Sequence, residues 1–343
     1  MAETASNAGN AAVLLDQCLV RYNELRPCTT AFIDTRTPGS AEKENFTIIG
    51  PGVAENPDRH VHISVPHGFN IGGARQPPNC VNSQHSHETA EVFMIHSGTW
   101  AFYLGPNRED GEVVLRQGDI ISIPVHVFRG FKNVGEEPGF MFAVLGGDDP
   151  GHVTWAPYVF EYAAKYGLVL LDDGSLVDTT RGERVPADKQ PMRPTTEADV
   201  ERLRRMSAAE LAECIVTAPE LDADEAAMTA AGLRESAVIG SANPDEGIAA
   251  GKMHWPHGFH LRHIAAQSGV ATRRHRRQER EVILMHRGLL TVEFDKQRVT
   301  LGPGDTLTIP IGLPRSFSNE SPETAEAWVV RGSDRPKPAA LLS

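Results

Sequence analysis

The sequence predicts an all-β protein made of two tandem barrels of short strands, with short linking helices. A block that carries several distinctive residues in the first half recurs in the second half. Each copy consists of short apolar runs, rich in β-branched and aromatic residues and separated by turns. The 31 glycines and 24 prolines among 343 residues also favour a turn-rich β protein. At roughly 150 residues per domain, this length suggests about two domains.

The repeat extends over two blocks of each copy. The motif Pro-His-Gly-Phe at residues 66–69 recurs 190 residues later, at 256–259. The same spacing then pairs His85 with His275, Glu91 with Glu281, Val92 with Val282, His96 with His286 and Gly98 with Gly288. In the second block, residues 118–133 align with 304–319 and share Gly, Asp, Ile, Pro, Arg, Phe and Asn. We infer two copies of one domain.

The two blocks differ in spacing because the first copy has a longer hairpin tip. The segment GPNREDGE at 105–112 is rich in turn formers, whereas the second copy is shorter near Asp295. Length changes are tolerated best at such tips. The predicted organisation is an N-terminal helical arm (1–44), an N-terminal barrel (45–148), a linker with short helices (149–236), a C-terminal barrel (237–335) and a tail (336–343).

Individual elements follow from local patterns. Residues 91–105 and 281–294 predict paired strands with a glycine at the turn, and 119–124 and 305–310 predict short strands after a Gly-Asp turn. Residues 13–25 have helical spacing, and so do 195–206, where Thr196 is a suitable N-cap. Ser207 and Glu210 form a capping box that opens a second short helix. We expect these helices to cover sheet edges or to join the barrels.

Composition excludes several classes of function. With 33 Lys and Arg against 45 Asp and Glu, the net charge of −12 argues against nucleic-acid and anionic membrane partners. No apolar run approaches the roughly 18 residues of a membrane span, and the N-terminus does not resemble a signal peptide. The four cysteines form no CxxC pair, which predicts a reduced, cytoplasmic protein with no disulfide framework and no zinc ribbon.

One short segment carries the residue types of a metal site. Residues 85–91 read His-Ser-His-Glu-Thr-Ala-Glu, so His85 and His87 project from the same face of a strand. Glu91 follows His87 by four residues, so its side chain projects from the same face if the strand stays extended. Two neutral imidazoles and a carboxylate on one face form a facial metal triad that leaves open positions for substrate and O2. Such a set suits Fe(II), Mn(II), Ni(II) or Zn(II), and it does not suit calcium.

These residues resemble the signature of the cupin superfamily, G(x)5HxH(x)3E(x)6G followed by G(x)5PxG(x)2H(x)3N. The matching positions are His85, His87, Glu91 and Gly98, with Asn79 at the leading glycine, and then Gly118, Pro124 and Asn133. The resemblance covers roughly 200 residues and implies two double-stranded β-helix, or jelly-roll, barrels. Two-barrel cupins of this length resemble gentisate-type ring-cleaving dioxygenases and quercetinases. The fold follows more firmly than the activity, because this fold hosts many unrelated reactions.

The chain departs from the signature where a third histidine usually completes the site. His126 stands at the glycine position, and Arg129 stands at the histidine position. His126 could supply a nearby fourth ligand, or it could be a turn residue that only hydrogen-bonds near the site. Arg129 could pair with Glu91 in place of a metal, or it could bind an anionic substrate bidentately.

The second copy departs further. It retains His275 and Glu281, but Arg277 replaces the second histidine and Arg315 the third. We therefore predict that the C-terminal barrel binds no metal and is either a structural partner or a pocket for an anion. The alternative for the run Arg273, Arg274, Arg276, Arg277 and Arg280 is a solvated strand face.

The resemblance implies a metal-dependent enzyme. The favoured activity is a mononuclear non-haem iron dioxygenase with one metal, Fe(II) before Mn, Ni or Zn, on a small anionic aromatic or enolisable substrate. His85, His87 and Glu91 would hold the metal, and Arg129 and His126 are the candidate catalytic residues. The alternatives are a non-oxidative isomerase, lyase or decarboxylase, and a non-catalytic small-molecule-binding protein. The resemblance also suggests a homo-oligomer.

Overall fold

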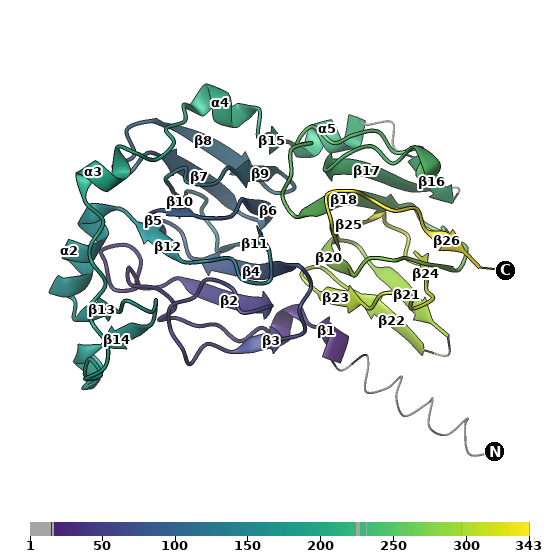
Figure 1. Ribbon diagram of the computed structural model, residues 1–343. Helices are drawn as coiled ribbons and strands as arrows, with labels where there is room; N and C mark the ends of the chain where they lie inside the picture. Colours follow the sequence, from purple (N-terminus) through teal and green to yellow (C-terminus); the bar gives the residue numbers. More distant parts are fainter. Residues whose placement is uncertain (1–14, 16, 224–226, 231, 296, 343) are drawn as a thin grey trace, which may run out of the picture. The chain divides into compact units, whose positions relative to one another are not determined.

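The computed structural model describes residues 15, 17–223, 227–230, 232–295 and 297–342 (Figure 1). The chain divides into two compact units, residues 26–218 and residues 1–25 with 219–343. Both are built from mainly antiparallel sheets with only short helices, which confirms the predicted all-β class of tandem jelly-roll barrels. In the described part of the chain, no helix has both the length and the apolar character needed to span a membrane.

The N-terminal barrel lies in the unit of residues 26–218. A seven-stranded sheet, in the order β15-β9-β6-β11-β4-β2-β3, faces a five-stranded sheet in the order β12-β5-β10-β7-β8. The strands of this unit are β2 (Glu44–Ile49), β3 (Val61–Ile63), β4 (Phe69–Gln76), β5 (Val81–His87), β6 (Glu91–Ser97), β7 (Thr99–Leu104), β8 (Gly111–Arg116), β9 (Ile120–Ile123), β10 (Arg129–Asn133), β11 (Gly139–Gly146), β12 (Val153–Trp155), β13 (Leu168–Leu170), β14 (Leu176–Asp178) and β15 (Ile215–Val216).

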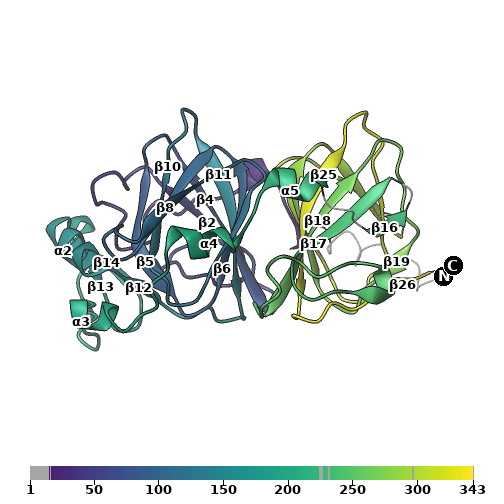
Figure 2. The ribbon, with the colours of Figure 1, turned by 90° about the horizontal axis from the view of Figure 1, so that it is seen from above.

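Short helices follow the last long strand of this barrel. They are α2 (Pro157–Lys165), α3 (Glu197–Val200), α4 (Ala208–Ala212) and a 3-10 turn at Thr179–Arg181. Helix α2 starts with a proline, which suits the first helical position, and buries Val159 and Ala163 on one face. Figure 2 shows α2 and α3 gathered with β13 and β14 beside β5 and β12.

Two sequence-predicted helix starts are confirmed in this region. Thr196 and Ser207 each accept a hydrogen bond from the backbone three residues on, and the side chain at that position bonds back to the cap. The predicted helix over 195–206 was too long, because α3 ends at Val200. Only Val200 of that helix is buried, so little apolar packing supports further turns.

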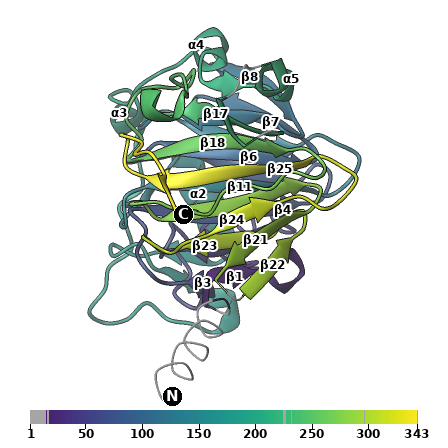
Figure 3. The same ribbon diagram turned by 90° about the vertical axis from the view of Figure 1, so that its right-hand side faces the viewer.

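The C-terminal barrel repeats the same plan. Its main sheet has the order β1-β23-β20-β25-β18-β17-β16, and a smaller sheet has the order β22-β21-β24. Figure 3 shows β17, β18 and β25 running side by side. The elements of this unit are β1 (Leu19–Val20), β16 (Ala227–Ala230), β17 (Leu233–Ile239), β18 (Phe259–Ala266), β19 (His275–Arg276), β20 (Glu281–Arg287), β21 (Leu290–Phe294), β22 (Gln297–Leu301), β23 (Thr306–Ile309), β24 (Ser316–Ser318), β25 (Ala325–Gly332) and β26 (Ala340–Leu341), with 3-10 turns at Tyr22–Glu24 and Pro244–Glu246. Helix α5 (Ala218–Ala223) lies at the division between the units.

In each barrel, the seven-stranded sheet has at one edge a short strand that comes from the segment preceding the other barrel in sequence. Strand β1 pairs with β23, with Leu19 opposite Leu307, whereas β15 pairs with β9, with Ile215 opposite Ile121. Ile121 and Leu307 are equivalent in the repeat. The prediction of a helix over residues 13–25 is therefore wrong for the second half of that segment, which forms β1 and a 3-10 turn. Residues 13, 14 and 16 lie outside the described residues. An apolar Leu-Val pair is better buried as an edge strand.

The glycine that follows the glutamate in each copy is required by the backbone. Gly98 has φ +87°, and a Cβ there would lie 2.8 Å from the Cα of Gly139. Gly288 has φ +67°, and a Cβ there would lie 2.6 Å from the carbonyl oxygen of Thr324. Asn79 stands at the leading glycine of the signature and has φ 68°, a conformation that asparagine tolerates better than most residues.

The two compact units are longer than the two barrels expected from the repeat. The N-terminal compact unit also contains residues 26–44 and 149–218, and the strands of the C-terminal barrel begin before residue 237. These flanking segments pack on the barrels but are not repeated. Lys43, for example, is fully buried in an ion pair with Asp34. The repeat therefore located the strands that carry the motifs and missed the segments that cover them.

Candidate metal centre

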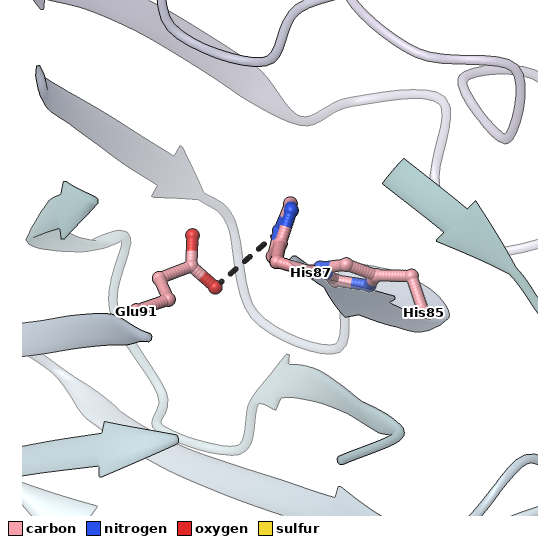
Figure 4. A group of neighbouring side chains, drawn as sticks. All are labelled: His85, His87 and Glu91. Carbon is pink, nitrogen blue, oxygen red and sulfur yellow. Dashed lines mark ion pairs between the residues drawn. The ribbon is translucent and has the colours of Figure 1, made fainter. Parts of the chain in front are cut away.

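The structure brings the three predicted ligands together. His85 and His87 stand at the end of β5, and Glu91 opens β6 after a three-residue turn. All three are buried, and one ligand atom of each lies within 4.8 Å of the others. Figure 4 shows the three side chains converging, with the Nε2 atom of His87 3.6 Å from the Oε2 atom of Glu91.

Both imidazoles are held in the neutral form that binds metals. The Nδ1 atom of His85 lies 2.7 Å from the carbonyl oxygen of Ser83, which assigns the proton to Nδ1 and leaves the lone pair on Nε2. Burial, and then the positive charge of Arg129, holds the pKa of His85 and of His87 well below its usual range. A neutral imidazole does not have to lose a proton before it coordinates a cation.

Arg129 is hydrogen-bonded to the carboxylate of this cluster. It lies opposite His85 in the ladder between β10 and β5 and is 1% exposed. Its guanidinium donates to the carbonyl oxygen of His85 at 3.2 Å and to Oε2 of Glu91. That oxygen is also the one that faces His87. Burial raises the pKa of Glu91, and the charge of Arg129 offsets part of this effect.

His126 lies outside the cluster. Its side chain is exposed, and its backbone has φ 61°, a left-handed conformation that explains why glycine usually occupies this position. The backbone N–H of His126 donates to the carbonyl oxygen of His87 at 2.9 Å. The main chain of His126 therefore supports the end of β5, and a role for its side chain stays a prediction.

The donor set fits one divalent transition metal. Two neutral imidazoles and one carboxylate suit Fe(II), Mn(II), Ni(II) or Zn(II). Arg129 and a metal would compete for Oε2 of Glu91. A carboxylate has two oxygens with about four acceptor positions, so Glu91 can serve both partners.

The cluster forms the polar end of a small cavity inside the N-terminal barrel. The cavity has a volume of about 70 Å³. Its polar lining residues are Asn45, Thr47, Asn82, His85, His87 and Glu91. The rest of the wall is mostly apolar and includes Phe32, Phe46, Val53, Phe93, Phe131, Ala143, Leu145, Val153 and Trp155. Arg129 is not among the lining residues, so any effect on a bound molecule would pass through Glu91.

Sequence reasoning missed the residues that hold His85 in place. The ring of Trp155 lies 5.1 Å from that of His85, and its Nε1 donates to Oε1 of the buried Glu55 at 2.6 Å. Lys43 donates to Oδ1 of Asn82 at 3.0 Å. Asn82 could have been suspected from its place three residues before His85. The others lie outside the repeat and carry no motif signal.

Asp34 completes this support from the same non-repeated segment. It is fully buried, forms the ion pair with Lys43, and accepts a hydrogen bond from the backbone N–H of Ser83 at 2.9 Å. Ser83 is the residue whose carbonyl oxygen orients His85. The arm before the first repeat therefore fixes both Asn82 and the strand segment that carries the ligands.

The equivalent position of the C-terminal barrel holds arginines around its glutamate. Arg315 donates to Oε1 of Glu281 at 2.8 and 3.2 Å, and Arg331 donates to Oε2 at 2.6 Å. Arg277 lies 3.4 Å from the same oxygen. Both oxygens of Glu281 are thus engaged by guanidinium groups. Binding of a cation here would have to displace them, and the lack of a metal in this barrel stays a prediction.

Comparisons with known proteins agree with the repeat. The family described as "Cupin domain" matches residues 74–145 and 261–331. A germin-like protein (subfamily 1 member 10) of Arabidopsis thaliana is 31% identical over 83 residues, 23% of this chain and 37% of that protein. A germin-like protein of Mesembryanthemum crystallinum is 32% identical over 102 residues, 27% of this chain and 43% of that protein. The matches thus span about two fifths of these relatives.

Solved structures share the fold over nearly the whole chain. The formate complex of Lactobacillus farciminis oxalate decarboxylase has a TM-score of 0.57 at 11% identity and covers 95% of this chain and 88% of its own. The vicilin of Solanum melongena has a TM-score of 0.55 at 12% identity and covers 96% and 87%. The expected resemblance to gentisate-type dioxygenases is not confirmed by these similarities.

Proposed function

We propose that this chain, which its two cupin domains identify as a bicupin of the cupin superfamily, is a metal-dependent enzyme whose active site lies in the N-terminal barrel. His85, His87 and Glu91 would hold one divalent metal, with Fe(II) favoured and Mn, Ni or Zn as alternatives. The observation that carries this proposal is the converging cluster of two neutral imidazoles and a carboxylate at the end of an apolar cavity. A bound metal would supply a Lewis-acidic or redox-active centre there.

The proposed activity is that of a dioxygenase on a small aromatic or enolisable compound. The cavity supports this choice because its aromatic and aliphatic wall fits an apolar body and excludes water. Asn82 lies at the same end of the cavity, where its amide oxygen accepts from Lys43 and its Nδ2 atom lies 3.4 Å from the Nδ1 atom of His85. Glu91 lies at the same end and accepts a hydrogen bond from Arg129. We further propose that the protein is cytoplasmic and forms a homo-oligomer.

The second candidate is a non-oxidative, metal-dependent reaction such as a decarboxylation. The fold likeness to oxalate decarboxylase favours it, and the third histidine of the signature is replaced by Arg129. The cavity favours a substrate with a largely apolar body over a small dianion, because no lysine or arginine is among the described residues that line it. A binding protein without catalysis is the third outcome and would show ligand binding without turnover.

Metal content tests the proposal first. We expect about one equivalent of metal per chain after reconstitution with Fe(II) under argon, and a loss of most of it in His85→Ala. His275→Ala, the equivalent change in the other barrel, should leave the metal content unchanged. Equal metal content in His85→Ala and the wild-type protein would refute the assignment. Oxygen uptake with hydroxylated aromatic acids, compared with turnover under argon, then separates dioxygenase from non-oxidative chemistry.

A further inference from the structure

The C-terminal barrel contains its own cavity, which is larger than that of the N-terminal barrel. Its volume is about 280 Å³, close to the lower end of the range of small-molecule sites, roughly 300–1,000 Å³. A large part of its wall is apolar. The apolar lining residues are Leu233, Ile264, Phe317, Pro338, Ala339 and Leu341. The cavity therefore offers an apolar surface to a small molecule.

The last segment of the chain forms one side of this cavity. Strand β26 pairs with β19, with Leu341 opposite His275 (Figure 2). The backbone N–H of Leu342 donates to the carbonyl oxygen of Arg274 at 2.8 Å, and the backbone N–H of Ala339 donates to Oε1 of Glu246 at 2.9 Å. The wall of the cavity therefore depends on the C-terminal segment, and its properties belong to the full chain.

The buried charged groups of the wall are already paired with one another. Arg331 donates to Glu235 and to Glu281, each at 2.6 Å. Arg277 donates to Glu246 at 2.9 and 3.3 Å. An incoming anion would have to displace carboxylates from these two guanidinium groups. The paired charges therefore favour an uncharged molecule over an anion.

His275 supplies a buried hydrogen-bond acceptor to the same wall. It lines the cavity and is 7% exposed. Its Nδ1 atom lies 3.1 Å from the carbonyl oxygen of Arg273, which assigns the proton to Nδ1 and the lone pair to Nε2. Ser83 orients His85 in the same way. Nε2 of His275 accepts no hydrogen bond from the described residues, so it is the ring nitrogen available to a molecule in the cavity.

The surroundings of His275 keep its ring neutral. Burial, and then the positive charge of Arg315, lowers the pKa of His275. A neutral imidazole keeps the lone pair on Nε2, which accepts from an O–H group and repels a carboxylate oxygen. The ring of Phe317 lies 5.4 Å from that of His275, at an interplanar angle of 79°. An acceptor and an aromatic surface thus lie side by side.

We propose that the cavity of the C-terminal barrel binds a small uncharged hydroxyl compound with an apolar body, of the class of phenol. The hydroxyl group donates its hydrogen to Nε2 of His275, and the apolar body lies against Leu233, Ile264 and Phe317. Such a molecule satisfies the buried acceptor and leaves the ion pairs of the wall intact. The site lies in the other barrel from His85 and requires no metal.

Titration calorimetry of the full chain with phenol at pH 7 tests this proposal. Phenol is uncharged at this pH because a phenolic hydroxyl has a pKa of about 10, and its methyl ether, anisole, keeps the ring but lacks the donor. Metal is first removed with EDTA. We expect one phenol per chain and at least tenfold weaker binding of anisole. His275→Leu should weaken phenol binding at least tenfold, and His85→Leu, the equivalent change in the N-terminal barrel, should leave it unchanged.

The nitrogen resonances of the histidine rings give a second readout, which reports the hydrogen bond itself. In ¹⁵N-histidine-labelled protein, phenol should shift the Nε2 resonance of His275, identified by its absence in His275→Leu, and anisole should not. Ile264→Phe, which fills the apolar part of the cavity, should weaken phenol binding while His275 remains. The proposal is overturned if the wild-type protein does not bind phenol, if anisole binds equally well, if benzoate binds more tightly than phenol, or if phenol binding is lost in His85→Leu and kept in His275→Leu.

Discussion

Arg129 donates a hydrogen bond to Glu91 from the ladder position opposite His85. Arg315 holds the same relation to Glu281 in the second barrel, where it pairs with His275 across an isolated bridge. The arginine–glutamate pair is therefore common to both barrels. Two positions distinguish the barrels. His87 offers a lone pair where Arg277 offers a positive charge, and Leu145 lies opposite Glu91 where Arg331 lies opposite Glu281.

We expect Arg129→His to raise the affinity of the N-terminal site for Fe(II) or Mn(II) by tenfold or more. The change releases Oε2 of Glu91, removes a positive charge beside the site, and adds an imidazole at the position of the third histidine. Competition with a fluorescent chelator measures the affinity. Arg315→His is the matched control and should create no site, because Arg277 and Arg331 still hold Glu281. An unchanged affinity in Arg129→His would contradict the assigned ligand set.

Arg315→Met should destabilise the C-terminal barrel by about 3 kcal/mol, because it leaves one oxygen of the fully buried Glu281 without its donors. The midpoint and slope of urea unfolding measure this loss. Arg298→Met removes an arginine from exposed ion pairs of the same barrel and should change stability by less than about 1 kcal/mol. Similar losses in both variants would mean that burial of the Glu281 pair is not the cause.

Lys43→Met should destabilise the N-terminal barrel by about 3–5 kcal/mol, because Asp34 would remain buried without its counter-charge. Adding Asp34→Asn should recover a large part of the loss, since asparagine keeps an acceptor for the backbone N–H of Ser83. A double-mutant cycle in urea measures the coupling. Lys43→Met should also weaken metal binding through Asn82 and Ser83, which flank His85.

His96 should make the protein less stable in mild acid. Burial lowers its pKa to about 4 in the folded chain, against about 6.5 in the unfolded chain. The unfolded chain therefore gains a proton in this window that the folded chain does not, so the stability contributed by neutral His96 is present above pH 6.5 and lost as the pH falls toward 4. Comparing urea unfolding at pH 7.5 and 5.0, His96→Leu should lose about 2 kcal/mol less than the wild-type protein. Equal losses would show that His96 titrates normally.

Gly98→Ala should cost about 2 kcal/mol or more, because it places a Cβ at positive φ and 2.8 Å from the backbone of Gly139. Gly288→Ala should cost a similar amount in the other barrel, where the Cβ meets the carbonyl oxygen of Thr324. Gly68→Ala is the control, since it has a positive φ but no atom within 4 Å of a new Cβ. It should therefore show only the backbone strain. Thermal unfolding of the three variants provides the comparison.

The repeat and the cupin signature determined the class of fold, the two barrels and the grouping of His85, His87 and Glu91. These features depend on spacing along one strand and its following turn, which the sequence records directly. The capping boxes at Thr196 and Ser207 were predictable for the same reason, because the interacting groups are three residues apart.

Only the tertiary structure decided what surrounds these groups. It pairs Arg129 with Glu91 across 38 residues and brings Glu55 to Trp155 across 100, and it leaves Arg262 buried without an acidic partner. It also turns part of a predicted helix into the edge strand β1, paired with a strand almost three hundred residues away. Such contacts depend on which segments the fold packs together. Neither periodicity nor local spacing records them, because the partners are distant in the chain.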